Sequence, residues 1–111
     1  EMLLLMEKIY RNEAASPAHC KQMLGILEKQ RDRDQIPRFL TGPEWEGVRT
    51  ATKTGALNQV RNDVGIVFTP QGDIALSLFA QRSADQKWTS DNRASLALAR
   101  LAEALARHLR H

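Results

Sequence analysis

The sequence predicts an α+β fold, in which helices pack on one antiparallel sheet of three strands. Apolar residues recur at helical spacing near both ends of the 111-residue chain. The middle third is instead rich in β-branched residues, which favour strands. The expected order is therefore helix, helix, three strands and a long helix. We find no internal repeat and no linker between two domains.

The first helix is expected over about residues 1–12. The apolar residues on its main face are Met2, Leu5, Met6 and Ile9. Leu3 and Leu4 extend the apolar surface around the helix, and a helix that is apolar nearly all round is normally buried. No Ser, Thr, Asp or Asn caps its start. We therefore expect the chain to begin inside a helix that a longer protein covers.

Ser16 and Pro17 mark the start of a second helix, expected over residues 17–30. Ser is a favoured capping residue and Pro suits the first helical position. The alternating charges of residues 31–34 predict a solvated turn. Residues 36–40 are expected to form a short helical or irregular segment, because the proline after Ile36 disfavours helical geometry at that residue.

Three strands are expected over residues 48–52, 64–68 and 74–80. The last two are joined by the turn residues 70–73, so they should form an antiparallel hairpin. A long final helix follows, capped by Asp91 or a neighbour, and it carries leucines on one face to the end of the chain.

Composition and charge exclude several functional classes. Sixteen Lys and Arg against thirteen Asp and Glu give a net charge of +3, but no aromatic stacking motif accompanies it, so no nucleic-acid partner is expected. The apolar run Met2–Met6 is far shorter than the roughly 20 residues of a membrane span, so none is expected. A single Cys excludes an internal disulfide. His19, His108 and His111 are isolated, so no metal ion or other cofactor is expected.

Lys53-Thr54-Gly55 follows the first expected strand directly and is the candidate for chemistry. Lys53 supplies a positive charge for a substrate carboxylate or a neighbouring nucleophile, and Thr54 supplies a hydroxyl that can hydrogen-bond the carboxylate. Gly55 has no side chain, so a substrate amide can lie against the strand as an added strand. The next backbone N–H, that of Ala56, could point at a developing oxyanion.

The chain resembles the C-terminal half of the class A β-lactamase family and its close serine-hydrolase relatives. Three stretches carry the resemblance: Ile-Pro-Arg at 36–38, Val-Arg-Thr-Ala-Thr-Lys-Thr-Gly at 48–55, and Val-Arg-Asn-Asp-Val-Gly-Ile-Val at 60–67. The family's order of elements is also similar, and the resemblance covers essentially all 111 residues.

This resemblance implies a role for each residue of the motif region. Lys53 and Thr54 would line the β-lactam pocket, and the Ala56 N–H would be one of two oxyanion donors. Arg61 would help to hold the substrate carboxylate, from a loop expected between Gly55 and the second strand. Export to the periplasm or out of the cell is implied in the same way.

Other parts of the family's catalytic machinery have no counterpart here. No Ser is followed by Lys three positions later, so the nucleophile motif S-x-x-K is missing. The acidic loop, whose Glu positions the deacylating water in the family, is also missing. Ser90-Asp91-Asn92 spells the family's S-D-N motif, but it follows K-T-G and opens the last helix, so we interpret it as a helix cap. We therefore expect residues 1–111 to be the C-terminal portion of a β-lactamase-like domain, inactive without its N-terminal part.

Two alternatives stay open. Penicillin-binding relatives share K-T-G, so a peptidoglycan peptide is the alternative substrate. The chain could also be a non-catalytic interaction module of the same fold, with the apolar first helix as a partner or dimer surface. Outside the family context, Lys53-Thr54 would read as an ordinary polar strand end before a glycine turn.

Overall fold

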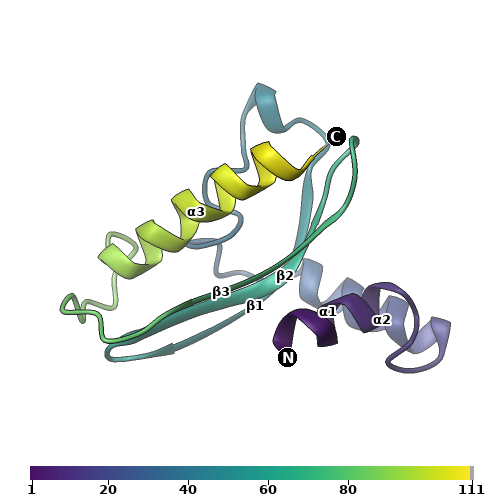
Figure 1. Cartoon of the computed structure of the whole chain (residues 1–111), viewed down its shortest axis with the longest axis horizontal. Coiled ribbons are helices and arrows are strands. Elements are labelled where there is room, and N and C mark those ends of the chain that lie inside the picture. Colours follow the sequence, from purple (N-terminus) through teal and green to yellow (C-terminus); the bar gives the residue numbers. More distant parts are fainter. Residues whose placement is uncertain (111) are drawn as a thin grey trace.

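The computed structural model describes residues 1–110 and confirms the α+β class (Figure 1). The elements in chain order are α1 (Met2–Tyr10), α2 (Pro17–Glu28), the 3-10 helix η1 (Pro43–Trp45), β1 (Arg49–Leu57), β2 (Val60–Phe68), β3 (Ile74–Ala80) and α3 (Arg93–Leu109). The strands form one antiparallel sheet in the order β1-β2-β3. Helix α3 lies along one face of this sheet, and α1 and α2 lie on the other side.

Both N-terminal helices form close to their expected positions. Helix α2 begins at Pro17 as predicted, and the Ser16 side chain caps it by accepting a hydrogen bond from the His19 N–H at 3.2 Å. Helix α1 turns only Met6 and Ile9 into the protein. Within residues 1–110, no helix combines the length and the apolar character that crossing a membrane requires.

The sheet differs from expectation in its first two strands. Both are longer than predicted, and they pair continuously from Arg49↔Phe68 to Leu57↔Val60. The loop expected after Gly55 is therefore wrong, because only Asn58 and Gln59 join the two strands. Polar residues here hid the strand pattern, since pairing with a neighbouring strand overrides weak β-propensity. Strand β3 and its hairpin with β2 are confirmed.

The main core lies between the sheet and α3. Its buried residues are Ile36, Leu40, Trp45, Val67, Ile74, Leu76, Leu78, Leu98, Ala102 and Ala106. A smaller cluster on the other face combines Met6, Val64 and Ile66 with partly buried side chains of α2. Small residues on α3 allow the helix to lie close to the strands. The sheet is covered on both faces, but not over its whole length.

The last helix is capped by Asn92, which confirms that Ser90-Asp91-Asn92 acts as a helix cap. The Asn92 Oδ1 accepts a hydrogen bond from the Ser95 N–H at 3.1 Å. Its Nδ2 donates to the carbonyl oxygens of Asp85 and Lys87 at 3.0 and 2.9 Å. This fully buried side chain therefore also fixes the loop that precedes α3.

Candidate functional site

The Lys-Thr-Gly motif lies inside strand β1 and not, as predicted, at its end. The antiparallel register pairs its residues with β2 as Lys53↔Val64, Thr54↔Asp63, Gly55↔Asn62 and Ala56↔Arg61. Strand β1 is buried over residues 50–52 and becomes exposed from Lys53 onward, apart from half-buried Thr54. Because β1 is an edge strand of the sheet formed by residues 1–110, the motif lies on an uncovered sheet edge.

Lys53 and Thr54 face opposite sides of the sheet, because successive residues of a strand alternate. Lys53 shares its face with Val64, and its Nζ donates a hydrogen bond to the Thr54 carbonyl oxygen at 2.6 Å. Thr54 shares its face with Asp63, on the side of α3. The ammonium is exposed and forms no ion pair with a carboxylate of the described residues. Its charge is therefore available to an incoming anion.

Of the two glycines in the β1–β2 hairpin, only one occupies a position where the structure leaves no room for a side chain. A Cβ built on Gly65 would lie 2.2 Å from the Ala51 carbonyl oxygen and 2.8 Å from the Thr52 Cα, so the strand pair itself requires glycine. A Cβ built on Gly55 would meet no atom within 4 Å. The contacts within the described residues therefore do not require glycine at position 55.

The orientation of the Ala56 N–H follows from its neighbours along the strand. The carbonyl oxygens of Thr52 and Thr54 accept hydrogen bonds from the side chains of Gln30 and Lys53, at 3.5 and 2.6 Å. In an antiparallel ladder, every second residue directs its N–H and C=O toward the same side. We therefore expect the Ala56 N–H to point away from β2, into the space beyond the sheet edge.

Arg61 is 5% exposed, and the main chain holds its guanidinium. One guanidinium nitrogen donates to the carbonyl oxygens of Leu57 and Val60 at 2.5 and 2.8 Å, and the other donates to that of Lys87 at 2.7 Å. The guanidinium also lies over the Trp88 ring, 4.5 Å from its centroid. These contacts tie the β1–β2 turn to the loop before α3. Binding of a substrate carboxylate by Arg61 stays a prediction, and it requires one of these contacts to exchange.

Asp63 is a residue of the site region that the sequence reasoning missed. It is fully buried opposite Thr54, and its Oδ2 accepts a hydrogen bond from the Ile36 N–H at 2.9 Å. Burial raises the pKa of its carboxyl to about 7, although the backbone N–H groups of Ile36 and Val64 oppose this shift. An acidic residue inside a largely apolar strand was the signal available in the sequence.

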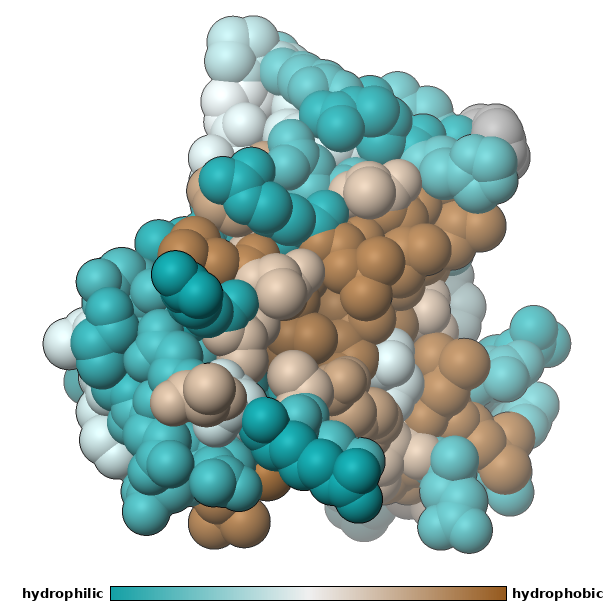
Figure 2. Space-filling model, turned by 60° about the vertical axis from the view of Figure 1, so that its left-hand side comes forward, coloured by the Kyte–Doolittle hydropathy of each residue, from teal (hydrophilic) through white to brown (hydrophobic). Residues whose placement is uncertain are grey.

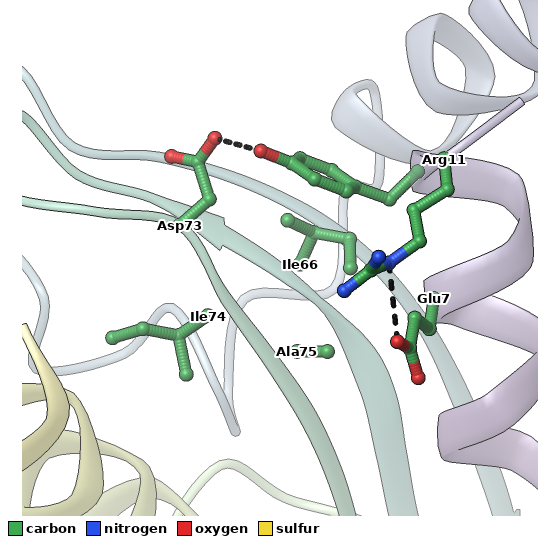
Figure 3. A pocket seen from close by; sticks show the side chains of 7 residues that line it. Glu7, Arg11, Ile66, Asp73, Ile74 and Ala75 are labelled. Carbon is green, nitrogen blue, oxygen red and sulfur yellow. Dashed lines mark hydrogen bonds and ion pairs between the residues drawn. The ribbon is translucent and has the colours of Figure 1, made fainter.

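A separate cavity of about 210 Å³ lies between α1 and the start of β3 (Figure 3). Its lining residues are Glu7, Tyr10, Arg11, Ile66, Asp73, Ile74 and Ala75. The Tyr10 hydroxyl donates to the Asp73 carboxylate at 2.7 Å, and Arg11 pairs with Glu7 at 3.1 Å. Its polar groups are thus already paired with each other, and none belongs to the Lys-Thr-Gly motif. Among residues 1–110, no three His, Cys, Asp or Glu side chains gather to hold a metal ion.

The sequence model of the beta-lactamase enzyme family matches residues 1–109. The chain belongs to this family. This beta-lactamase-family chain is therefore of hydrolase lineage, and the resemblance recognised from its sequence is confirmed. No protein of the curated set matches it.

Solved structures support the same fold. The chain is similar to the beta-lactamase from Sphaerobacter thermophilus DSM 20745, with a TM-score of 0.81 and 30% identity, over 96% of this chain and 38% of that one. It is also similar to PBP-A, with a TM-score of 0.80 and 24% identity, over 96% of this chain and 37% of that one. A mutant of PBP-A in an acyl-enzyme complex with penicillin G matches equally well. The PBP-A comparisons show the fold alone.

The chain spans less than two fifths of the length of these structures. The roles of Lys53, Thr54, Gly55, Ala56 and Arg61 therefore stay predictions.

Proposed function

We propose that this chain is the C-terminal part of a class A β-lactamase-like serine hydrolase, which opens the β-lactam amide through an acyl-enzyme. The observation that carries this proposal is the family match over residues 1–109, together with a Lys-Thr-Gly motif on an uncovered sheet edge. The 38% coverage of the Sphaerobacter β-lactamase supports the idea that the enzyme is formed with a further part of the same domain.

In this proposal the nucleophile is a serine outside the 111 residues, and it attacks the lactam carbonyl to form the acyl-enzyme. Lys53 and Thr54 bind the substrate carboxylate by charge and by hydrogen bonding. The Ala56 N–H is one of the oxyanion donors, and Gly55 lets the substrate lie against β1. Arg61 provides a further contact to the carboxylate after it exchanges a main-chain partner. We also propose a periplasmic or secreted location, on the family resemblance.

The 111 residues alone should not turn over substrate, because they supply binding groups but no activated nucleophile. The purified chain is expected to leave a chromogenic β-lactam intact, and hydrolysis by it would overturn this division of roles. The longer gene product that contains these residues is expected to form a covalent adduct with a fluorescent penicillin.

Lys53→Ala in that longer protein tests the site. Loss of a charge-assisted hydrogen bond costs about 1.5–3 kcal/mol, so acylation should slow roughly ten- to hundredfold. Lys21→Ala is the matched control, because this lysine is exposed on α2, away from the motif, and its replacement should leave acylation unchanged. Equal acylation by wild type and Lys53→Ala would remove Lys53 from the site.

A penicillin-binding peptidase is the second candidate, favoured by the match to PBP-A and its penicillin G acyl-enzyme. The two enzyme classes differ in the lifetime of the acyl-enzyme. Release of the fluorescent penicillin within the assay would indicate a β-lactamase, whereas a persistent adduct with slow cleavage of a peptidoglycan peptide would indicate the peptidase.

A non-catalytic interaction module is the third candidate. The first turn of α1 leaves Met2, Leu3, Leu4 and Leu5 between 39% and 53% exposed. Apolar surface also extends across one face of the molecule between polar margins (Figure 2). If this surface binds a second copy, sedimentation should show a dimer that Leu4→Lys dissociates. A monomer at all concentrations would argue against this role for α1.

A further inference from the structure

Two buried acceptor atoms lack a hydrogen-bond donor where residues 35–36 contact β2. They are Oδ1 of Asp63 and Oε1 of Gln35; the hydroxyl oxygens of Thr50 and Thr52 on β1 are also buried without a hydrogen-bond partner. The Asp63 and Gln35 side chains are almost inaccessible to solvent, at 0% and 2% exposure. A buried acceptor without a partner destabilises a fold, because it has lost its hydrogen bonds to water. While Asp63 is ionised, neither of these two residues supplies a donor to the other, and neither Thr hydroxyl hydrogen-bonds to them.

Two hydrogen bonds place the Gln35 and Asp63 side chains where residues 35–36 contact β2. The Ile36 N–H donates to Asp63 Oδ2 at 2.9 Å, and Gln35 Nε2 donates to the Asn62 carbonyl oxygen at 3.2 Å. Consecutive residues of one segment thus bind consecutive residues of β2. Because the Asn62 oxygen can only accept, the amide nitrogen of Gln35 must face it, and Oε1 is the free end.

We propose that Asp63 is protonated in the folded chain and donates its O–H to Gln35 Oε1, so that one proton clamps residues 35–36 onto β2. The carboxylic acid then satisfies both free acceptors, while its other oxygen still accepts from the Ile36 N–H. An ionised Asp63 would instead set a second acceptor, with a buried negative charge, beside the Gln35 oxygen.

The charges around Asp63 favour the neutral acid. Asp32, on the segment that leads to Gln35, raises the pKa of the Asp63 carboxyl by repulsion, and Lys53 lowers it. Lys53 is exposed on the opposite face of β1. On β3 the residue paired with Asp63 is Leu78, and the buried residues of α3 carry no charge. Burial is the largest cause of the raised pKa, and it outweighs the backbone N–H groups of Ile36 and Val64, which lower the pKa.

The clamp, which consists of Gln35, Ile36 and Asp63, lies beside the strand that carries the Lys-Thr-Gly motif. Asp63 pairs with Thr54 across the β1–β2 register and shares its face of the sheet. Ile36, whose N–H is the clamped donor, is fully buried in the main core. The proton therefore links the crossing segment, the core and the strand that carries Lys53 and Thr54.

The sign of the pH dependence follows from the raised pKa. The folded chain keeps the Asp63 proton up to about pH 7, whereas the unfolded chain loses it near the ordinary value of 3.8. The contribution of the clamp to stability is present at low pH, declines across this window as pH rises, and is lost above about pH 7.

Urea unfolding of the 111-residue chain from pH 4 to pH 8 tests the proposal. Asp63→Asn keeps the shape, carries no charge, and offers an N–H₂ donor in place of the proton. Its urea midpoint should therefore lose the decline that the wild type shows between the two pKa values. Glu46→Gln removes an exposed carboxylate of η1's C-terminal flank and should keep the wild-type profile. The same pH profile in wild type and Asp63→Asn would overturn the clamp.

A second measurement needs no substitution. In a chain labelled with carbon-13 in aspartate, the Asp63 carboxyl resonance should keep the chemical shift of a protonated acid up to about pH 7, well above the ordinary aspartate pKa of 3.8. Gln35→Met removes the acceptor of the proton, so titration of Asp63 should then shift to lower pH. Titration of wild-type Asp63 near its ordinary value of 3.8 would show an ionised group and refute the proposal.

Discussion

Alanine at Gly65 should disrupt the β1–β2 pair, whereas alanine at Gly55 should not. At Gly65 the new Cβ would lie 2.2 Å from the Ala51 carbonyl oxygen and 2.8 Å from the Thr52 Cα. Both contacts involve backbone, so no side-chain rotation relieves them. The strands must separate locally by about 1 Å to reach ordinary contact distances.

This separation costs free energy in two ways. Over-packing of a close-packed interior costs about 1–3 kcal/mol, and each backbone hydrogen bond lost costs roughly 0.5–1.5 kcal/mol. With two such bonds lost, Gly65→Ala should lower the free energy of unfolding by about 2–6 kcal/mol. Because small domains are stable by only about 5–15 kcal/mol, this variant should be close to unfolding.

Gly55→Ala is the matched comparison, because it makes the same chemical change on the paired strand β1, two residues before its end at Leu57. Its Cβ meets no atom within 4 Å, and replacing glycine by alanine in a strand favours folding by roughly 0.5–1 kcal/mol. In the longer protein that we propose, however, the added methyl group should slow acylation by penicillin, because it occupies space beside the motif where we propose that the substrate lies.

Urea unfolding followed by circular dichroism measures both effects. With a denaturant slope of about 1–3 kcal/mol per molar urea, Gly65→Ala should lower the midpoint by at least about 0.7 M, while Gly55→Ala should leave it unchanged or raise it. Equal midpoints for Gly65→Ala and the wild type, or a Gly55→Ala midpoint as low as that of Gly65→Ala, would refute the reasoning.

Two other predictions concern the cap of α3 and the only tyrosine. Asn92→Ala should lower the free energy of unfolding by about 2 kcal/mol in urea, because it removes a helix cap and two bonds to loop carbonyls. Asp91→Ala should have little effect, and a larger loss in that variant would assign the cap to Asp91. The pKa of Tyr10 should lie above its ordinary 10.0, because its O–H donates to Asp73 and ionisation would place two negative charges together. Absorbance titration of this single tyrosine should show the shift, and Asp73→Asn should reduce it; a titration that Asp73→Asn leaves unchanged would contradict the contact.

Local patterns in the sequence predicted those elements whose signals lie within a few residues. The Ser16-Pro17 pair marked the start of α2, and the turn over residues 70–73 marked the β2–β3 hairpin. The family resemblance extended this local reading to the whole chain, and the match over residues 1–109 confirms it. These features depend on capping geometry and side-chain alternation, which neighbouring residues set by themselves.

The β1–β2 hairpin could not be recognised in the same way. The half of this hairpin nearer its turn contains Lys53, Asn62 and Asp63, whose side chains are unusual in strands. No glycine marks its two-residue turn. These residues adopt strand geometry because each strand supplies the other with main-chain hydrogen bonds. The position of Lys-Thr-Gly within a strand, and not after one, follows from that pairing.

The sequence by itself determined the α+β class, the family and the chemical groups of the motif, because residue identity and short-range spacing carry that information. Only the tertiary structure decided which groups are free and which are engaged. It leaves Lys53 and Gly55 on an open edge, and it surrounds the Arg61 guanidinium with carbonyl oxygens. It also buries Asp63 against the Ile36 N–H, 27 residues away along the chain. Burial and partners of this kind come from segments distant in sequence, so they exist only once the chain has folded.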